Sequence, residues 1–307
     1  MNATSPPLEA EQSAYVFVAF SSTLAVLILA GNSLVITAYH RNVHLQTRTN
    51  TFIVSLAVSD LLVGGVSVPI WTYLTFFNYQ EDVQGLFEFY ISFDTFSALA
   101  SIFHLTAISV ERYLAISRPF DHSALSSRVY KCMIMAAWFL AGIMAAFSML
   151  SSSLSFRAVS TVIVFATGFV LPVVLMLTVY TGIFRTARAL IDRTPESTRN
   201  KIREERKVAL TVSVITVLFL IAWLPFFVVS MLGQFCVSCL PNEDSQKNAL
   251  VAFVKWMHYT NSVVNPLVYA FRDREMRSSF VKLIGICKTE RYNRRDENLD
   301  NNPNAIV

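Results

Sequence analysis

Asp94 and Arg112 place two opposite charges inside one apolar stretch of the sequence, residues 93–116. They lie about five helical turns apart, so a single helix carries both side chains on the same face. At about 1.5 Å per residue their separation is roughly 27 Å, close to the thickness of a bilayer's hydrocarbon core. An ionisable residue inside a membrane segment is a functional candidate because burying it is costly. The carboxylate calls for a cation near one membrane face, and the pair suggests that a signal sensed at one face is reported at the other.

A second group of polar residues lies in otherwise apolar stretches. A single Asn or Ser in a membrane helix commonly hydrogen-bonds to a neighbouring helix. Together, however, one carboxylate and several neutral oxygens make a donor set that suits a hard monovalent cation, provided that their helices converge. The members of this group are Asp60, Ser101, Asn261, Ser262 and Asn265.

The composition indicates a membrane protein. Of the 307 residues, 54% are hydrophobic and 15% are charged, whereas a soluble domain has roughly 25% charged residues. Seven stretches are long and apolar enough to cross a bilayer. They predict an all-α membrane protein, a seven-transmembrane helix bundle with a short amphipathic eighth helix. The predicted spans are 14–39, 50–76, 87–116, 130–150, 158–184, 208–234 and 249–271.

The basic residues predict the orientation of the bundle. With the N-terminus outside, all of the 25 Lys and Arg residues except Arg157, Lys247 and Lys255 fall in cytoplasmic segments or at their membrane edge. This asymmetry follows the positive-inside rule, and we expect a multi-pass protein of the plasma membrane with an extracellular N-terminus. Topology and lipid headgroups explain the basic surface, so no nucleic-acid partner is expected.

The chain divides into an N-terminal segment 1–13, the bundle 14–271, an amphipathic helix 272–287 and a disordered polar tail 288–307. Asn2 begins a glycosylation triplet on the outside. Cys236 and Cys239 share the last outer loop, where a local disulfide is expected. Cys287 is a candidate for palmitoylation, with a free cytosolic thiol as the alternative. Cys132 lies inside the fourth span, where we expect a buried, inert thiol.

Three motifs, one at the inner end of span three and one each in spans six and seven, resemble the signature motifs of rhodopsin-like (class A) G-protein-coupled receptors, most closely those of the biogenic-amine group. Asn32, Trp138 and Pro172 also match expected residues in spans one, four and five. The resemblance covers all seven spans, residues 14–285. The three motifs are Glu111-Arg112-Tyr113, Ala222-Trp223-Leu224-Pro225 and Asn265-Pro266-Leu267-Val268-Tyr269.

The resemblance implies a switch at the inner end of the bundle. Glu111, together with Glu205 of span six, would hold Arg112 in the inactive state, and activation would free Arg112 to meet a heterotrimeric G protein. Trp223, beside the helix-kinking Pro225, would be the pivot. The other switch residues that the resemblance implies are Tyr113, Tyr180, Pro172, Ile102, Phe219, Asn265, Pro266 and Tyr269.

The resemblance also implies that Asp94 pairs with the ammonium of a small extracellular ligand, a biogenic or trace amine, and that Tyr259 fixes the Asp94 rotamer. Aromatic side chains would supply apolar walls and cation–π faces. Apart from an allosteric sodium ion at the Asp60 group, no cofactor is implied. The further implied partners are arrestin, a receptor kinase and membrane lipids. The implied ligand-binding residues are Asp94, Thr95, Ala98, Val164, Phe165, Trp223, Phe226, Phe227, Lys255, Trp256 and Tyr259.

Three departures from the amine-receptor pattern bear on the ligand. Lys255 lies one turn outward of Tyr259, where it either pairs with Asp94 or snorkels to the outer surface. If it pairs, a zwitterionic or acidic ligand is the alternative to an amine. In span five, Val164 and Phe165 stand where catecholamine receptors place hydroxyl groups, which argues against a catechol. Phe87 stands where the family has the cysteine of its span-three disulfide, so that staple is absent.

Two other classes of membrane protein use buried ionisable residues. An ion-coupled transporter would use Asp60, Asp94 and Lys255 as an ion path, but the sequence has no inverted repeat and the three motifs would go unexplained. An opsin would carry its retinal lysine at position 259, which is a tyrosine. The five histidines are scattered along the chain, so no hydrolytic site is formed. The sequence therefore predicts a receptor and no enzymatic activity.

Overall fold

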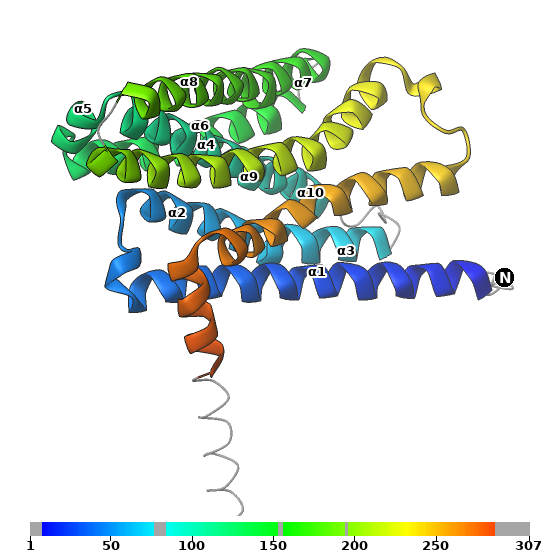
Figure 1. Ribbon diagram of the computed structural model, residues 1–307. Coiled ribbons are helices and arrows are strands. Elements are labelled where there is room, and N and C mark those ends of the chain that lie inside the picture. Colours follow the sequence, from blue (N-terminus) through cyan, green and yellow to red (C-terminus); the bar gives the residue numbers. More distant parts are fainter. Residues whose placement is uncertain (1–7, 77–83, 153–155, 194–195, 286–307) are drawn as a thin grey trace, which may run out of the picture.

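The computed structural model describes residues 8–76, 84–152, 156–193 and 196–285, and within them most side chains of 190–212 are left out. Every regular element in the described residues is a helix (Figure 1). The long helices lie side by side as one bundle, which confirms the predicted fold class. Their bounds are α1 Leu8–Arg41, α2 Arg48–Leu62, α3 Val68–Phe76, α4 Gln84–Ser117, α6 Ser127–Ser152, α7 Arg157–Phe165, α8 Leu171–Arg193, α9 Glu196–Phe235 and α10 Asp244–Arg272.

Short elements join or interrupt these helices. The 3-10 turns η1 (Val43–Leu45) and η5 (Val237–Cys239) and the short helix α5 (Pro119–Ala124) lie in connections. The π-helical turns η2 (Val63–Ser67) and η4 (Ala166–Val170) divide two membrane spans, α2–α3 and α7–α8. The apolar pattern of the sequence does not predict either π turn. Such turns re-aim the side chains that follow them and often occur near functional sites.

Six helical segments of the described chain are long and apolar enough to cross a membrane, and α10 falls outside this set. The reason lies in its polar residues, among them Lys255, His258, Asn261 and Asn265, which are all buried inside the bundle. A helix with such an interior face loses apolar character without losing its place in the bundle. The seventh predicted span therefore corresponds to α10, which has neighbours on both sides in α1 and α9.

Helix α4 is the central element and contacts α2, α6, α8 and α9 (Figure 1). Its apolar face joins a core that includes Leu99, Ile102 and Leu105. Asp94 and Arg112 lie toward opposite ends of this one helix. We call the two ends of the bundle the Asp94 end and the Arg112 end.

A chain of hydrogen bonds links α2, α4 and α6 in the middle of the bundle. Trp138 Nε1 donates to Ser55 Oγ at 3.0 Å, and the Ser55 hydroxyl lies 2.8 Å from His104 Nε2. His104 Nδ1 lies 2.7 Å from the carbonyl oxygen of Ala100, which can only accept. His104 therefore donates from Nδ1, and in the neutral form its Nε2 accepts from Ser55, which satisfies all three polar side chains.

Close helix contacts are made at glycines. A Cβ at Gly31 would lie 3.1 Å from the Pro266 ring, and a Cβ at Gly64 would lie 2.7 Å from Ile28 Cγ2. Both glycines let α1 approach its neighbours closely, as small residues do in membrane bundles. Asn32 fixes the same interface, because its Nδ2 donates to the Ser262 carbonyl oxygen at 3.0 Å.

After α10, residues 274–285 form a further helix that leaves the bundle at an angle (Figure 1). Asp273 caps it, accepting backbone hydrogen bonds from residues 275 and 276. Met276, Phe280 and Leu283 are buried, while Ile284 is exposed. The buried stripe follows helical periodicity and anchors this segment against the bundle.

Candidate functional site

At the Asp94 end, a buried ion pair joins α4 to α10. Lys255 Nζ donates to Asp94 Oδ2 at 2.6 Å, and Tyr259 donates from its hydroxyl to Asp94 Oδ1 at 3.2 Å. Asp94 is 4% exposed and Lys255 is 6% exposed. The hydroxyl of Tyr90 lies 2.8 Å from that of Tyr259. Of the two positions that the sequence allowed for Lys255, the structure has the paired one.

Aromatic rings surround the ammonium of Lys255. Its Nζ lies 4.7 Å from the ring centre of Phe226, 5.0 Å from that of Tyr90 and 5.7 Å from that of Tyr259. These distances fall within the range of cation–π attraction. Tyr90 was not among the predicted site residues. It lies one helical turn before Asp94, on the face that Asp94 shares, and this spacing could have identified it.

The floor of this end is formed by Trp223 and His258. Their rings lie 3.8 Å apart between centroids, and Trp223 also lies near Phe219, at 5.5 Å. His258 Nδ1 and Trp223 Nε1 are buried and have no hydrogen-bond partner among the described residues. Two polar nitrogens are thus left for a ligand or water to satisfy.

The other predicted ligand residues lie on α4, on α9 and on the span formed by α7 and α8. Phe227 packs on Phe169 at 4.4 Å and on Phe165 at 5.4 Å, which joins α9 to the span of α7 and α8. Ala98 is buried in the same core cluster, and Val164 packs against it. Thr95 is partly buried on α4.

Trp256 was predicted to be one of the aromatic residues around the ligand ammonium, but it does not face the rings that surround the Lys255 ammonium. Its Nε1 donates to Ser21 at 3.1 Å, and its ring contacts Phe17 and Phe20 of α1. It also lines an apolar groove between α1, α9 and α10. Successive residues of a helix point about 100° apart, so Trp256 cannot share the direction of its neighbour Lys255.

In the middle of the bundle, the predicted polar group converges on Asp60. Ser262 donates to Asp60 Oδ1 at 2.7 Å, and Asn265 donates from Nδ2 to Asp60 Oδ2 at 2.9 Å. The Ser101 side chain also interacts with Asp60, and its hydroxyl bonds with Ser59 at 3.0 Å and with the Ser97 carbonyl oxygen. All of these side chains are buried.

The donor set at Asp60 includes oxygens that could face a bound cation. The side-chain oxygens of Asn261 and Asn265 are buried without a hydrogen-bond partner among the described residues. Asp60 supplies one carboxylate, and no group of three or more His, Cys, Asp or Glu that could hold a metal ion occurs in the described part of the chain. Neutral oxygens around a single carboxylate fit a monovalent, oxygen-seeking cation such as sodium.

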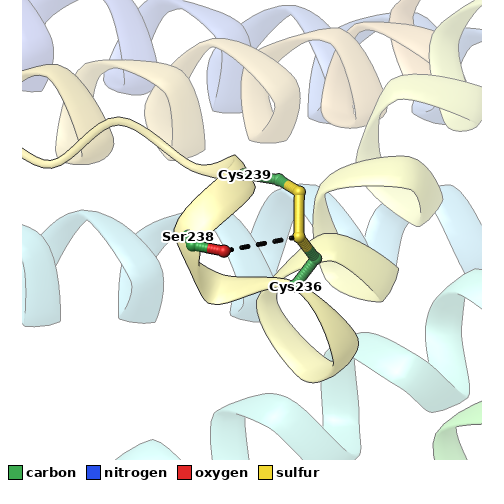
Figure 2. Close-up of a disulfide and its surroundings, with 3 residues drawn as sticks. All are labelled: Cys236, Ser238 and Cys239. Carbon is green, nitrogen blue, oxygen red and sulfur yellow. Dashed lines mark hydrogen bonds between the residues drawn. A yellow bond between two sulfur atoms is a disulfide. The ribbon is translucent and has the colours of Figure 1, made fainter.

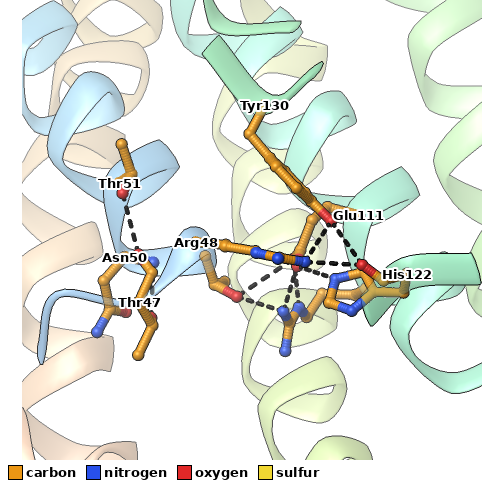
Figure 3. Close-up of polar contacts among 9 residues, drawn as sticks. Thr47, Arg48, Asn50, Thr51, Glu111, His122 and Tyr130 are labelled. Atoms are coloured by element: carbon orange, nitrogen blue, oxygen red, sulfur yellow. Dashed lines mark hydrogen bonds and ion pairs between the residues drawn. The ribbon is translucent and has the colours of Figure 1, made fainter. Parts of the chain in front are cut away.

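At the Arg112 end, Glu111 accepts from two sides (Figure 3). Arg112 donates to its carboxylate from Nε at 2.6 Å and from a terminal nitrogen at 2.5 Å, and His122 Nε2 lies 2.9 Å from Oε1. Thr49 of α2 contacts both Glu111 and Arg112. Glu111 is completely buried and Arg112 is 6% exposed.

Arg48 holds the same assembly from α2. Its guanidinium donates to the His122 carbonyl oxygen at 2.7 Å and lies over the Tyr130 ring at 4.9 Å (Figure 3). Arg48, Thr49 and His122 were not among the predicted site residues. Their positions lie in connections or at helix ends, and no periodic signal relates them to Glu111. The predicted second partner of Arg112, Glu205, has a side chain outside the described residues.

The remaining switch residues lie in the core between the two ends. The Tyr180 hydroxyl lies 2.7 Å from that of Ser109 and 3.0 Å from that of Thr216, so it bridges α8 to α4 and α9. The Tyr113 ring covers Gly182 of α8, where a Cβ would lie 2.8 Å from it. Other predicted switch residues are buried in the bundle, namely Ile102, Pro172, Phe219, Asn265, Pro266 and Tyr269.

Cys236 and Cys239 form a disulfide that closes its own loop after α9 (Figure 2). The Ser238 hydroxyl lies 3.6 Å from Cys236 Sγ. Cys132 was expected to be buried but is exposed on the outer face of α6. The sequence did not indicate which face of this helix points into the bundle. Asn2 and Cys287 lie outside the described residues.

Comparison with known proteins identifies the family. The family model described as "7 transmembrane receptor (rhodopsin family)" matches residues 31–269. A D(1)-like dopamine receptor of Oreochromis mossambicus is 31% identical over 87% of this chain and 78% of its own length. A D(1A) dopamine receptor of Didelphis virginiana is 29% identical over 94% and 77%, and the octopamine receptor beta-1R of Drosophila melanogaster is 28% identical over 85% and 60%. The chain therefore belongs to the rhodopsin family of seven-transmembrane receptors.

Proposed function

We propose that this receptor binds a small amine at the Asp94 end and passes the signal to a heterotrimeric G protein at the Arg112 end. Members of its family are receptors and not enzymes. One observation carries the ligand class: Asp94 already holds an ammonium, that of Lys255, at 2.6 Å and beneath the Phe226 ring. The same contacts suit the ammonium of a ligand. The names of the dopamine and octopamine receptors that resemble this chain support an amine.

The amine that we propose lacks a catechol. Val164 and Phe165 offer no hydroxyl to a ligand ring, and Phe165 stacks on Phe169 at 5.9 Å. Hydrogen bonding to a ligand instead falls to the unpaired nitrogens of Trp223 and His258 on the floor. A biogenic or trace amine whose ring carries no catechol hydroxyls fits these surroundings.

The Arg112 end is the proposed G-protein face. Arg112 is held there by Glu111 and Thr49, so its release needs the loss of a buried ion pair. Such a contact gives the two-state element that a switch requires. Arrestin and a receptor kinase are the further proposed partners on this face, and membrane lipids surround the bundle.

The proposed location is the plasma membrane with the N-terminus outside. In the sequence, all Lys and Arg residues except Arg157, Lys247 and Lys255 fall in or beside the segments that connect the inner ends of the spans or follow the last span. Positive charge of this kind stays on the cytoplasmic side. The Asp94 end then faces an extracellular ligand.

An allosteric sodium ion at Asp60 is the proposed cofactor. Asp60 would supply the charge, and the unpaired oxygens of Asn261 and Asn265 would supply neutral ligands. Bound there, the cation would neutralise a buried carboxylate in the core of the bundle. Ser262 and Asn265, which bond to Asp60, would orient it.

The amine assignment is tested in cells that express the receptor with a panel of biogenic and trace amines and a G-protein activation readout. We expect at least one amine to signal and Asp94→Asn to weaken its potency by about 100-fold, the effect of losing a buried charge partner. Glu88→Gln, an exposed acid on the same helix, is the matched control and should leave potency unchanged. Surface labelling corrects for expression. An amine response that survives Asp94→Asn undiminished would exclude Asp94 as the amine partner.

The G-protein assignment has a separate test. Arg112→Ala should abolish G-protein activation while binding of the active amine stays measurable, because Arg112 lies far from the Asp94 end. Normal activation in that variant would contradict the proposed switch.

A further inference from the structure

The Lys255 ammonium occupies the place that a ligand's ammonium would take. It has the hydrogen bond to Asp94 at 2.6 Å and the aromatic neighbours Tyr90, Phe226 and Tyr259. An amine that binds Asp94 in this cage must therefore displace Lys255. The lysine stem is flexible, so its ammonium can move while the helix stays in place.

Displacement leaves a charge without a partner. Lys255 is 6% exposed, and the other described carboxylates of this end, Glu88, Glu243 and Asp244, are all exposed to solvent. None of them is bonded to Lys255. A buried charge that loses its partner is strongly unfavourable, so a ligand that brings only a cation gains one ion pair and breaks another.

An acidic ligand without an amine would leave the opposite charge, that of Asp94, without its partner. It would draw Lys255 away and leave Asp94, which is 4% exposed, with only the Tyr259 hydroxyl. A single hydrogen bond from a neutral group does not replace a cation next to a buried carboxylate. Both single-charge ligands are therefore penalised by the same pair.

Resting on the proposed amine function, we propose that the receptor selects amines that carry an acidic group in the same molecule, with the ligand ammonium on Asp94 and the ligand anion on Lys255. Such a ligand exchanges one ion pair for two and keeps the site neutral. Lys255 is then the specificity-determining residue of the site.

The protein amino acids and the amines formed by their decarboxylation supply matched probes, since each pair differs only in the carboxylate. We would measure potency for the whole panel on the full-length receptor in cells, with wild type and Lys255→Met side by side. Lys247→Met, which removes a lysine nearer the start of α10, is the matched control. Asp94→Asn reports whether a response uses the amine site.

In wild type, we expect the most potent compound to be an amino acid that exceeds its decarboxylated partner by about tenfold or more, the effect of one retained ion pair. Lys255→Met should reverse that order, while Lys247→Met preserves it. Because Lys255→Met leaves Asp94 unpaired, surface labelling checks that each variant folds and reaches the cell surface. The double variant Asp94→Asn with Lys255→Met, which carries neither charge, should respond to neither class.

A wild-type receptor that prefers the decarboxylated amine, or an order that Lys255→Met leaves unchanged, overturns the selection of acid-bearing amines while the amine function stands. A panel in which no compound acts through Asp94 overturns the amine function, and the present inference with it.

Discussion

His122 Nε2 lies 2.9 Å from the Glu111 carboxylate, and this contact ties the short helix α5 to α4 beside Arg112. The carboxylate can only accept, so the histidine donates. Glu111 is thus shared between the arginine that the proposed switch must release and a histidine from a connecting segment.

His122→Ala should raise basal G-protein activation. It removes a hydrogen bond to a buried charged group, worth about 1.5–3 kcal/mol, from the state in which Glu111 holds Arg112. The measurement is nucleotide exchange without ligand, corrected for surface expression. His44→Ala, an exposed histidine of η1, is the control and should leave the basal rate unchanged. A basal rate in His122→Ala equal to that of wild type would show that the contact does not stabilise the inactive state.

Removing one partner of the Asp94–Lys255 pair should destabilise the receptor more than removing both partners. Asp94→Asn leaves a buried ammonium unpaired, and Lys255→Met leaves a buried carboxylate with one hydroxyl, each at a cost of about 3–5 kcal/mol. The double variant carries neither charge and should recover much of the loss. Melting temperatures of the three purified variants in detergent complete the cycle. Strictly additive losses would mean that the two side chains are not coupled.

Gly64→Ala should destabilise the bundle, and Gly65→Ala should not. A Cβ at Gly64 would lie 2.9 Å from Ile28 Cβ, whereas one at Gly65 has its nearest neighbour, Leu29 Cδ2, at 3.8 Å. Overpacking of this kind costs about 1–3 kcal/mol. Both glycines lie in η2, so the backbone effect of the substitution is matched. Equal melting temperatures for the two variants would contradict the close approach of α1.

Sodium should raise the melting temperature of the ligand-free receptor above the value in potassium at equal ionic strength. Binding to the folded state alone stabilises it by mass action. Asp60→Asn removes the carboxylate and should abolish the difference between the two salts. If Asp60→Asn keeps the full sodium effect, the cation binds elsewhere.

Much of the fold could be predicted from the sequence, because length and apolar character decide which segments cross a bilayer. The polar residues of α10 did not hide its span, since they recur on one helical face. The π turns η2 and η4 could not be predicted in this way. They depend on how neighbouring helices pack, and only Gly64 and Gly65 hinted at one of them.

The contacts within the site were harder to predict than its members. The resemblance to amine receptors predicted that Asp94 and Tyr259 face each other. Whether Lys255 pairs with Asp94 or snorkels to the outer surface depends on the rotamer of its side chain. Trp256 was misplaced because adjacent helix positions point in different directions. His122 was missed since its contact with Glu111 is set by the path of a connecting segment.

The bond chain from Trp138 through Ser55 to His104 has a mechanical consequence. Hydrogen bonds lose strength after a small displacement, so α2, α4 and α6 form a stiff half of the molecule. At Trp223 and Phe227, helix α9 meets its neighbours through tilted ring contacts, whereas nearer the Arg112 end Thr216 of α9 is hydrogen-bonded to Tyr180. A change at the Asp94 end would therefore displace this part of α9 more easily than it displaces α2, α4 or α6.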